Sequence, residues 1–380
     1  MTKNNSIDVF SPFPMAKHIS KIKPYKLVPS ESLTMHSEGN SVLKLDWNES
    51  VESPSNRVKK VICDFTTNNN LNWYPEIGSK ELISNISNYV KLPEEFIQVY
   101  NGSDGALFDI CLTYLSPNDN FFLFPPTYDN FRIFALSVGG KLSNIILPDV
   151  FTKDIEFCSN KISHSIKLVY ICNPNNPTGI CYSEDEIDYI LDKHKNVLFV
   201  IDEAYVEFVD SSVKNLTKKY NNIIITRTFS KAFGLAGVRC GYILTHPENI
   251  NSLNRIRSVK SVNALAQVAA IESIKDFKRI KNYIREIKLS TENLAIALDG
   301  LGFVTRSTKC NYLLFRTDNN KLWNNILRDN HIFVRGEIEI NGYGKWLRIT
   351  IGNKKYTDGL INILGGYKDL ILSGKINNRV

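Results

Sequence analysis

From about residue 95 the chain alternates between short apolar runs and helix-like segments, and this alternation constrains the fold more than any other feature. The apolar runs are rich in β-branched and aromatic residues and lie at 96–102, 120–126, 167–172, 196–205 and 222–229. Runs without polar–apolar alternation are typical of strands buried on both faces of a parallel sheet. Because helical patterns at 103–115 and 127–139 separate them, we predict an α/β fold with a large domain built on a mostly parallel sheet.

After residue 245 the pattern changes. Helical patterns dominate up to residue 301, and strand and helix patterns then alternate to about residue 373, which predicts a smaller α+β domain. We therefore divide the chain into an irregular N-terminal arm (1–24), a small-domain segment with a crossover (25–50), a large domain (51–270) and a C-terminal small domain (271–380).

Composition narrows the classes of function. The net charge of +7 comes from 46 basic and 39 acidic residues spread in ones and twos, so we expect no nucleic-acid partner. Seven cysteines form no C-x-x-C pair and six histidines show no ligand spacing, so we expect no metal site. The N-terminus lacks an apolar signal core and no apolar run reaches 18 residues, which predicts a cytoplasmic protein without a membrane span.

Two loops follow predicted strands of the large domain, where ligands of such sheets bind. "NGSDGA" (101–106) opens a helix with small residues, and it is either an anion site made of backbone N–H groups or a plain helix cap. "CNPNNPTG" (172–179) is an irregular loop fixed by two prolines. It either positions a side chain, with Asn176 as the candidate, or is only a rigid turn.

"VIDEAYVEF" (200–208) places Asp202 at the end of an apolar strand. A buried, unpaired carboxylate costs several kcal/mol, so Asp202 either has a cationic partner or caps the next element. A protonated pyridine nitrogen is one such partner, and Tyr205 lies in the same segment, where it could bond a neighbouring oxygen.

"TRTFSKAFGLAGVRCGY" (226–242) sets Lys231 in an apolar, small-residue stretch. Desolvation favours the neutral amine of a lysine, which is the form that attacks an aldehyde. An anion site, an aspartate for a ring nitrogen and a lysine nucleophile together describe a pyridoxal phosphate site. Thr228, Ser230 and Arg239 would join its phosphate cradle.

These motifs, in this order, resemble the fold-type-I pyridoxal-phosphate aminotransferases, and within them the histidinol-phosphate aminotransferases most closely. The resemblance runs from about Tyr25 to about Gly352. It also rests on further blocks: "KLDWNES" (44–50), "NWYPEIGSKEL" (72–82), "FPPTYDNF" (124–131), "IFVRG" (332–336) and "WLRITIG" (346–352).

The resemblance implies a role for each matching position. Lys231 would form the Schiff base, Asp202 would pair with the pyridine nitrogen, and Tyr205 with Asn176 would contact the ring oxygen. The other implied cofactor contacts are Tyr128 on the ring and Ser103, Asp104, Gly105, Thr228, Ser230 and Arg239 at the phosphate. Tyr74 would reach the cofactor phosphate of a neighbouring subunit, which implies a homodimer with shared active sites.

The substrate residues implied by the resemblance are Arg348 for the carboxylate and, at the distal phosphate, Arg335 with Tyr25 and Asn48. From the residues alone, arginines at strand ends are more often surface ion pairs. Three positions depart from the family pattern. Gly105 replaces an acidic residue, "SVES" (50–53) lacks an Asn-Pro, and Lys260 interrupts the segment before "NALAQ". All three lie where we expect the substrate side group or the hinge.

The implied reaction is transamination between glutamate or 2-oxoglutarate and a small, phosphorylated substrate, either histidinol phosphate or something shorter. Lys231 would be the general base that moves the Cα proton. A decarboxylase of phosphoserine or phosphothreonine is the alternative, because a small change in how the carboxylate is held redirects which bond breaks. A transcriptional regulator with an aminotransferase-like domain is disfavoured, since about 24 irregular residues are too few for a helix-turn-helix.

Overall fold

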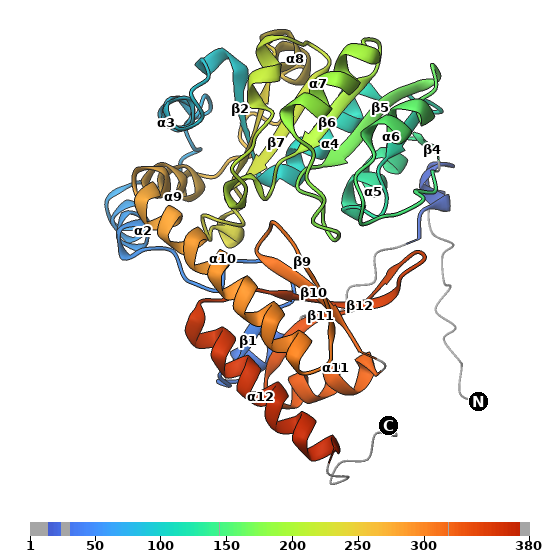
Figure 1. Ribbon diagram of the computed structural model, residues 1–380. Coiled ribbons are helices and arrows are strands. Elements are labelled where there is room, and N and C mark those ends of the chain that lie inside the picture. Colours follow the sequence, from blue (N-terminus) through green and yellow to red (C-terminus); the bar gives the residue numbers. More distant parts are fainter. Residues whose placement is uncertain (1–13, 24–30, 144, 318, 373–380) are drawn as a thin grey trace, which may run out of the picture.

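The structure is a computed structural model that describes residues 14–23, 31–143, 145–317 and 319–372. It contains two β-sheets, each with its own helices, and the larger sheet lies above the smaller one in Figure 1. Tyr25, one of the residues assigned from the sequence, lies outside the described residues.

In the described part of the chain, the larger sheet has seven strands in the order β2-β8-β7-β6-β5-β3-β4. Their bounds are β2 (Ile97–Tyr100), β3 (Asn120–Leu123), β4 (Lys141–Ser143), β5 (Ile166–Cys172), β6 (Leu198–Asp202), β7 (Ile223–Thr228) and β8 (Gly241–Thr245). All neighbouring pairs from β4 to β7 are parallel, and β8 runs antiparallel to both β7 and β2. The carboxyl ends of β5, β6 and β7 therefore meet at one edge.

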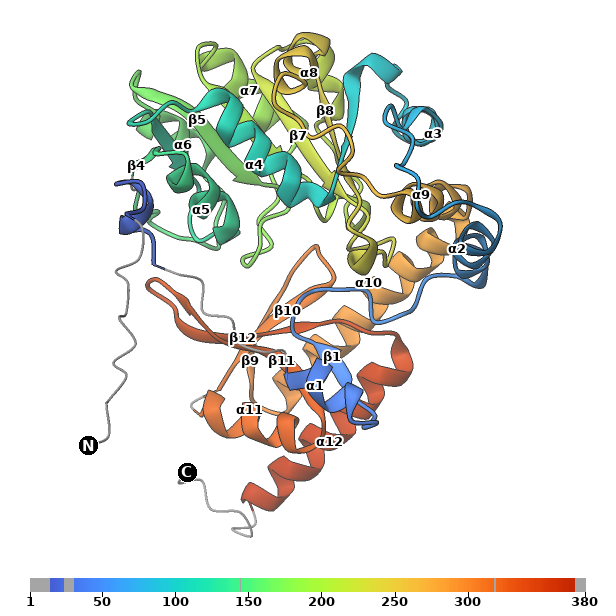
Figure 2. The same ribbon diagram turned by 180° about the vertical axis from the view of Figure 1, so that it is seen from behind.

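Helices cover both faces of this sheet, which explains the continuous apolar strands. One face packs on α4 (Gly102–Tyr114), α5 (Asp129–Ser137) and α8 (Pro247–Leu253), and α4 lies in front of the strands in Figure 2. The other face packs on α6 (Ile155–Lys161) and α7 (Glu184–Lys193). The α7 helix begins with a capping box, in which Ser183 and Glu186 bond each other's backbone N–H groups.

The smaller sheet has, among the described residues, five strands in the order β1-β11-β12-β10-β9. They are β1 (Leu43–Leu45), β9 (Val304–Ser307), β10 (Tyr312–Arg316), β11 (Ile332–Ile340) and β12 (Gly344–Thr350). The N-terminal strand β1 pairs parallel with β11, far away in sequence, so residues near 46 arrive beside the C-terminal strands.

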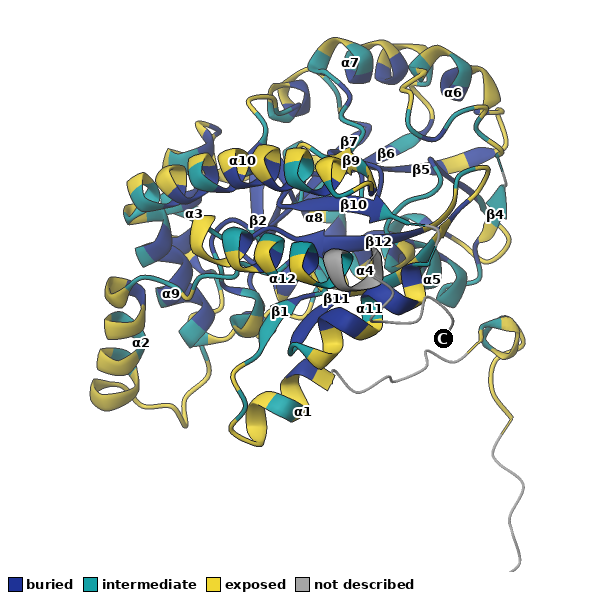
Figure 3. Ribbon diagram, turned by 60° about the horizontal axis from the view of Figure 1, so that its bottom comes forward, coloured by how far each residue is buried: buried dark blue, intermediate teal, exposed yellow. Residues whose placement is uncertain are grey.

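The remaining helices join and cover the two sheets (Figure 1). They are α1 (Glu31–Ser37), α2 (Asn56–Asn68), α3 (Lys80–Val90), α9 (Ala264–Lys275), α10 (Phe277–Gly300), α11 (Asn320–Asp329) and α12 (Lys354–Leu372). Short 3-10 helices are η1 (Ile19–Lys21), η2 (Glu94–Phe96), η3 (Val206–Phe208), η4 (Lys214–Lys218) and η5 (Ala236–Val238). The long helix α10 buries one face and exposes the other along its length (Figure 3).

The α/β fold with a mostly parallel large sheet and a smaller α+β part is confirmed. Sequence analysis did not identify β1, β4, β8, α2 or α3. Strand β11 continues beyond the "IFVRG" block (332–336) to Ile340 and forms a hairpin with β12. Among the described residues, no helix is long and apolar enough to cross a membrane.

Candidate active site

Asp202 lies at the carboxyl end of β6, between the ends of β5 and β7. The parallel register sets Asp202 beside Cys172 on one side and Thr226 on the other. Its two carboxylate oxygens accept hydrogen bonds from Tyr170 Oη (2.7 Å) and Thr226 Oγ1 (2.9 Å). Burial raises the pKa of Asp202 to about 6 although both hydrogen bonds oppose the shift, so at neutral pH the group is a buried carboxylate. No cation among the described residues forms an ion pair with it.

Lys231 lies in the turn between β7 and β8 rather than on a helix. Its Nζ donates to the backbone oxygen of Trp47 (2.9 Å) and lies 5.8 Å from the centre of the Tyr205 ring. Burial, followed by the positive charge of Arg348, lowers the pKa of Lys231 to about 8. A shift of this size increases the neutral amine fraction near pH 7 roughly 300-fold over an ordinary lysine.

Arg348, on β12, brings the smaller sheet to this edge of the larger one. Its Nη1 donates to Asn176 Oδ1 (2.7 Å) and its Nη2 to the backbone oxygen of Asp46 (2.9 Å). Its Nε is buried and has no hydrogen-bond partner among the described residues. The side chain is only 9% exposed, and burial lowers the pKa of its guanidinium. The backbone oxygen of Asp46 thus accepts a bond from Arg348, and that of Trp47 accepts one from Lys231. Both cations therefore contact the same short segment, residues 46–47.

Tyr205 and Asn48 form a second contact between the two parts of the molecule. Asn48 Nδ2 donates to Tyr205 Oη (2.9 Å), and burial raises the pKa of the tyrosine. Asn48 has a left-handed backbone (φ 55°) and its N–H donates to Thr350 Oγ1 (3.0 Å). Asn48, expected at the distal phosphate, therefore contacts the tyrosine expected at the ring oxygen.

The N-terminus of α4 forms a cradle with the turn after β7. Arg239 Nη2 lies 3.6 Å from Asp104 Oδ2, and Thr228 Oγ1 donates to Ser230 Oγ (2.9 Å). A Cβ on Gly102 would lie 2.6 Å from Arg239 Nη2, and one on Gly241 would lie 2.5 Å from the backbone nitrogen of Ser103. The glycines therefore let the backbone N–H groups of α4 and the Arg239 side chain come close together, as an anion site at a helix N-terminus requires.

Tyr128 stands beside this cradle. Its hydroxyl donates to Asp104 Oδ1 (3.0 Å) and accepts from Asn130 Nδ2 (2.7 Å), and burial raises its pKa. Gly105, in contrast to Gly102, has open space around its Cβ position, with the nearest atom at 3.9 Å. No steric requirement accounts for the glycine at 105.

Two further residues that the sequence assigned, Tyr74 and Arg335, are exposed. Tyr74 is 75% exposed, and Lys260 Nζ lies 3.7 Å from the centre of its ring. Arg335 is exposed on β11, but the antiparallel register places it directly beside Arg348. In the described part of the chain, neither arginine forms an ion pair with a carboxylate.

Sequence reasoning missed several contacts of the site. Tyr170 and Thr226 were read only as strand residues, although a hydroxyl within a run such as "KLVYIC" is a signal for a buried polar contact. The backbone oxygens of Asp46 and Trp47 carry no side-chain signal, so only the fold reveals them.

A buried carboxylate, an amine with a lowered pKa and an anion cradle stand at one sheet edge, and these are the groups that hold the ring nitrogen, aldehyde and phosphate of pyridoxal phosphate. Residues 40–364 match the family described as aminotransferase class I and II, and the chain belongs to this family. It is therefore an aminotransferase with pyridoxal phosphate as its cofactor.

The chain is also similar to individual members of this family. A dihydroxyacetone phosphate transaminase of Campylobacter jejuni is 38% identical over 89% of this chain and 93% of that protein. A histidinol-phosphate aminotransferase of Buchnera aphidicola is 32% identical over 93% of this chain and 98% of that protein. The structure of histidinol-phosphate aminotransferase from Sinorhizobium meliloti in complex with pyridoxal-5'-phosphate superposes with a TM-score of 0.84, at 22% identity, over 96% of this chain and 100% of that one. This last likeness shows the shared fold.

Proposed function

We propose that the protein transfers an amino group between glutamate or 2-oxoglutarate and a small phosphorylated ketone. The relatives' names support a phosphorylated substrate. Dihydroxyacetone phosphate and the ketone related to histidinol phosphate share the skeleton CH₂–CO–CH₂–O–phosphate and differ only in the group at the other end, a hydroxyl or an imidazole. Of the two, we propose the shorter ketone, because the higher identity is with the dihydroxyacetone phosphate transaminase.

The observation that carries the proposal is a pair of neighbouring guanidiniums, one of which, on Arg348, lowers the pKa of Lys231. Arg335 and Arg348 are directly opposed on neighbouring strands, and the charge of Arg335 contributes to lowering the pKa of Arg348. Like charges placed opposite each other are destabilising unless an anion lies between or beside them. A substrate carboxylate or phosphate would supply that anion, and the amine of Lys231, on which the charge of Arg348 acts, would react beside it.

The residues would divide the chemistry as follows. The cofactor, when bound, supplies an electron sink for the bonds at the substrate Cα. Asp202 is ionised at neutral pH and would hold the proton on the ring nitrogen, while Asn48 orients Tyr205 toward the ring oxygen. Lys231 Nζ, with its lowered pKa, would take the Cα proton and return it. Arg348 would bind the carboxylate of glutamate, and its orphaned Nε is the free donor for it.

The implied cofactor contacts extend these roles. We propose that Ser103, Asp104, Gly105, Thr228, Ser230 and Arg239 surround the cofactor phosphate, that Tyr128 stacks on its ring, and that Asn176 acts through Arg348 as well as at the ring oxygen. We also propose that 51–270 acts as the large domain, and that 25–50 with 271–380 acts as the small domain.

We further propose a homodimer in which Tyr74 serves the neighbouring subunit. Tyr74 lies within an exposed apolar segment in which Leu71, Trp73 and Ile77 are 58%, 72% and 49% exposed. A second copy of the chain would cover these side chains. A cytoplasmic location is supported by the cysteines, since all seven are unpaired and five of them are buried thiols.

The substrate proposal is tested with purified holoenzyme, first with glutamate and two acceptors. We expect release of 2-oxoglutarate with dihydroxyacetone phosphate, and a kcat/KM at least about 100-fold lower with dihydroxyacetone, which lacks only the phosphate. Histidinol phosphate, offered as amino donor with 2-oxoglutarate, probes the longer side group.

Each outcome decides between possible substrates. Equal kcat/KM for dihydroxyacetone phosphate and dihydroxyacetone would overturn the phosphate requirement. Faster turnover of histidinol phosphate would assign the longer substrate. Release of CO₂ from phosphothreonine or phosphoserine, without glutamate-dependent amination of the cofactor, would make the protein a decarboxylase.

A further inference from the structure

A cleft lies outside the active site described above, and none of the residues assigned to that site lines it. It has a volume of about 590 Å³ and lies between α10 and the segment of η3 and η4. That volume is within the range of roughly 300–1,000 Å³ that small-molecule sites occupy. Its lining includes five basic side chains, Lys214, Arg227, Lys281, Arg285 and Lys288.

Three of these cations come from a single face of α10. Lys281, Arg285 and Lys288 are spaced by four and three residues, so they lie one above another over about 10 Å of helix. All three side chains are exposed. A row of like charges on one helix face repels itself unless an anion neutralises it.

Carboxylates neutralise only part of this charge. Arg227 is buried and donates two bonds to Glu203, and Lys288 Nζ lies 3.5 Å from Asp210. Within the described residues, Lys214, Lys281 and Arg285 have no carboxylate within 4.0 Å. Lys214 donates to the backbone oxygen of Val90 (2.6 Å), and burial followed by the charge of Arg227 lowers its pKa.

The remaining acidic residue of the cleft opposes an anion only weakly. Glu207 accepts a bond from Tyr89 (3.3 Å), its Oε2 has no partner, and burial raises its pKa to about 7. Near neutral pH this carboxyl is protonated about half of the time, and in that form it donates a hydrogen bond.

We propose that this cleft is a second ligand site, which binds a compact small-molecule polyanion through Lys214, Lys281 and Arg285. The ligand has at least two negative charges about one α10 turn or more apart, as in a diphosphate or a tricarboxylate. A fork of guanidinium donors on Arg285 and two ammonium groups suit either chemistry. The site does not depend on which ketone the enzyme aminates.

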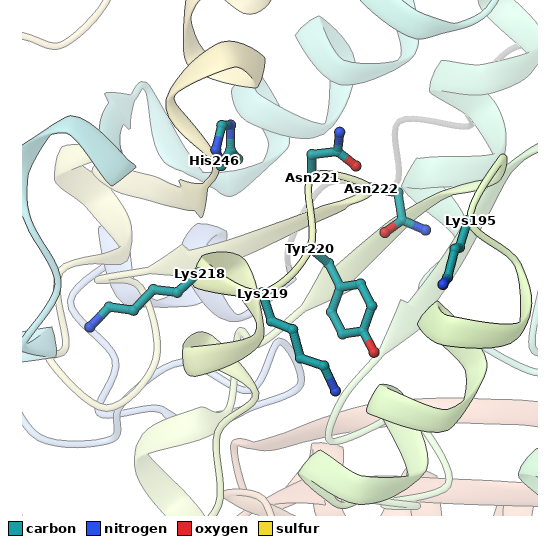
Figure 4. A pocket seen from close by; sticks show the side chains of 7 residues that line it. All are labelled: Lys195, Lys218, Lys219, Tyr220, Asn221, Asn222 and His246. Carbon is teal, nitrogen blue, oxygen red and sulfur yellow. The ribbon is translucent and has the colours of Figure 1, made fainter.

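Another basic cleft, of about 430 Å³, lacks these features (Figure 4). Its lining residues 218–222 directly precede β7, and His246 directly follows β8. They therefore lie at the sheet edge opposite the β7–β8 turn that contains Lys231. Lys195 pairs with Asp192 at 3.3 Å and Lys219 with Asp188 at 2.7 Å. In Figure 4 the Lys218 side chain extends away from that of Lys195, so the lysines of this cleft do not converge on one ligand.

The test is calorimetric titration of the pyridoxal phosphate-loaded enzyme with inorganic pyrophosphate and, separately, with citrate. We expect the double variant Lys281→Gln, Arg285→Gln to raise the Kd for a bound probe at least about tenfold. Lys278→Gln is the matched control, since Lys278 is an exposed cation of the same helix that does not line the cleft. Circular dichroism of each variant shows that the fold is retained.

Binding of both probes with loss in the double variant identifies a site for polyanions in general, and binding of pyrophosphate alone identifies one for phosphates. Equal Kd values for wild type and the double variant would place the probe elsewhere, such as at Arg335 and Arg348, and overturn the proposal. Absence of heat with either probe at millimolar concentration would overturn it as well.

Discussion

Arg348 influences Lys231 in addition to its proposed contact with substrate. After burial, the positive charge of Arg348 is the largest cause of the lowered pKa of Lys231. Glu49 and Asp104 act in the opposite direction, and Lys44 acts in the same direction as Arg348. The amine is therefore kept reactive by a neighbour from the other sheet, so the two parts of the molecule must be assembled before the lysine has its low pKa.

The lowered pKa of Lys231 predicts how the rate at which apoenzyme reacts with its cofactor depends on pH. The rate of absorbance change on mixing with pyridoxal phosphate should rise through about pH 8, because only neutral Lys231 reacts. Arg348→Gln should move that midpoint upward. Arg335→Gln, which removes a cation that does not act on Lys231 directly, should leave it in place, and a matching upward shift in that variant would contradict the assignment.

The raised pKa of Asp202 predicts that the free energy of unfolding depends on pH, and that this dependence changes when the cofactor binds. In the apoprotein its folded pKa of about 6 exceeds the unfolded value of 3.8, so the folded state holds the proton more strongly. The free energy of unfolding should therefore fall by about 2 kcal/mol as pH rises from 4 to 6, and by about 3 kcal/mol over the full range from below pH 3 to above pH 7. Urea unfolding of wild type and Asp202→Asn isolates this contribution, which the variant should lack.

Cofactor removal is the control for the same effect. A protonated ring nitrogen beside Asp202 favours the carboxylate, so the holoenzyme should not lose stability over this pH range through Asp202. An identical loss in holoenzyme and apoprotein would mean that Asp202 does not face the ring nitrogen.

At the scale of elements, the cradle depends on how closely α4 approaches the turn after β7. Gly102 has φ +75°, and any side chain there meets Arg239, whereas Gly105 lies within α4 with free space beside it. Gly102→Ala should weaken pyridoxal phosphate binding by 100-fold or more, measured by fluorescence titration of apoenzyme, because both strain and a steric clash oppose it.

Gly105→Ala is the matched substitution on the same helix. It should raise the free energy of unfolding by about 0.5–1 kcal/mol, since alanine is a better helix former, and leave cofactor affinity within about threefold. Loss of cofactor affinity in both variants alike would show that the cradle responds to helix stability rather than to close approach.

Five strands of the larger sheet, β2, β3, β5, β6 and β7, could be predicted because their apolar runs are continuous and each is followed by a polar turn. The strands β4 and β8 were not predicted. The positions of Asp202, Asn176 and Lys231 followed from one rule, that parallel strands end at a common edge. The pairing of β1 with β11 could not be predicted, since short apolar segments such as "LKL" carry no information about a partner almost 290 residues away. The Asn48–Tyr205 contact depends on that pairing and was missed with it.

At the scale of the whole molecule, the proposed homodimer would complete the phosphate side of the site. Tyr74 is exposed and stacks with Lys260, both outside the group of residues around Lys231. The surrounding exposed side chains, Leu71, Trp73 and Ile77, are the kind of surface that a monomer rarely leaves uncovered. A homodimer would cover this surface and deliver Tyr74 to the neighbouring cofactor phosphate.

Mixing two inactive variants tests that arrangement. Lys231→Ala should be inactive, and Tyr74→Ala should lose activity by about tenfold or more through one missing hydrogen bond to a charged group. In a heterodimer of the two, one site combines an intact Lys231 with an intact Tyr74 from the other chain. Random reassortment should therefore restore about a quarter of wild-type kcat, because half of the dimers are mixed and each has one working site.

Two results would contradict shared sites. If Tyr74 served its own chain, no mixed dimer would contain a complete site and mixing would restore nothing. If the protein sedimented as a monomer at full activity, the exposed segment would need another explanation. Trp73→Ala is the control, since it removes an equally exposed aromatic without a hydroxyl. It should weaken the dimer, which sedimentation measures, while the activity of the dimer that remains stays close to wild type.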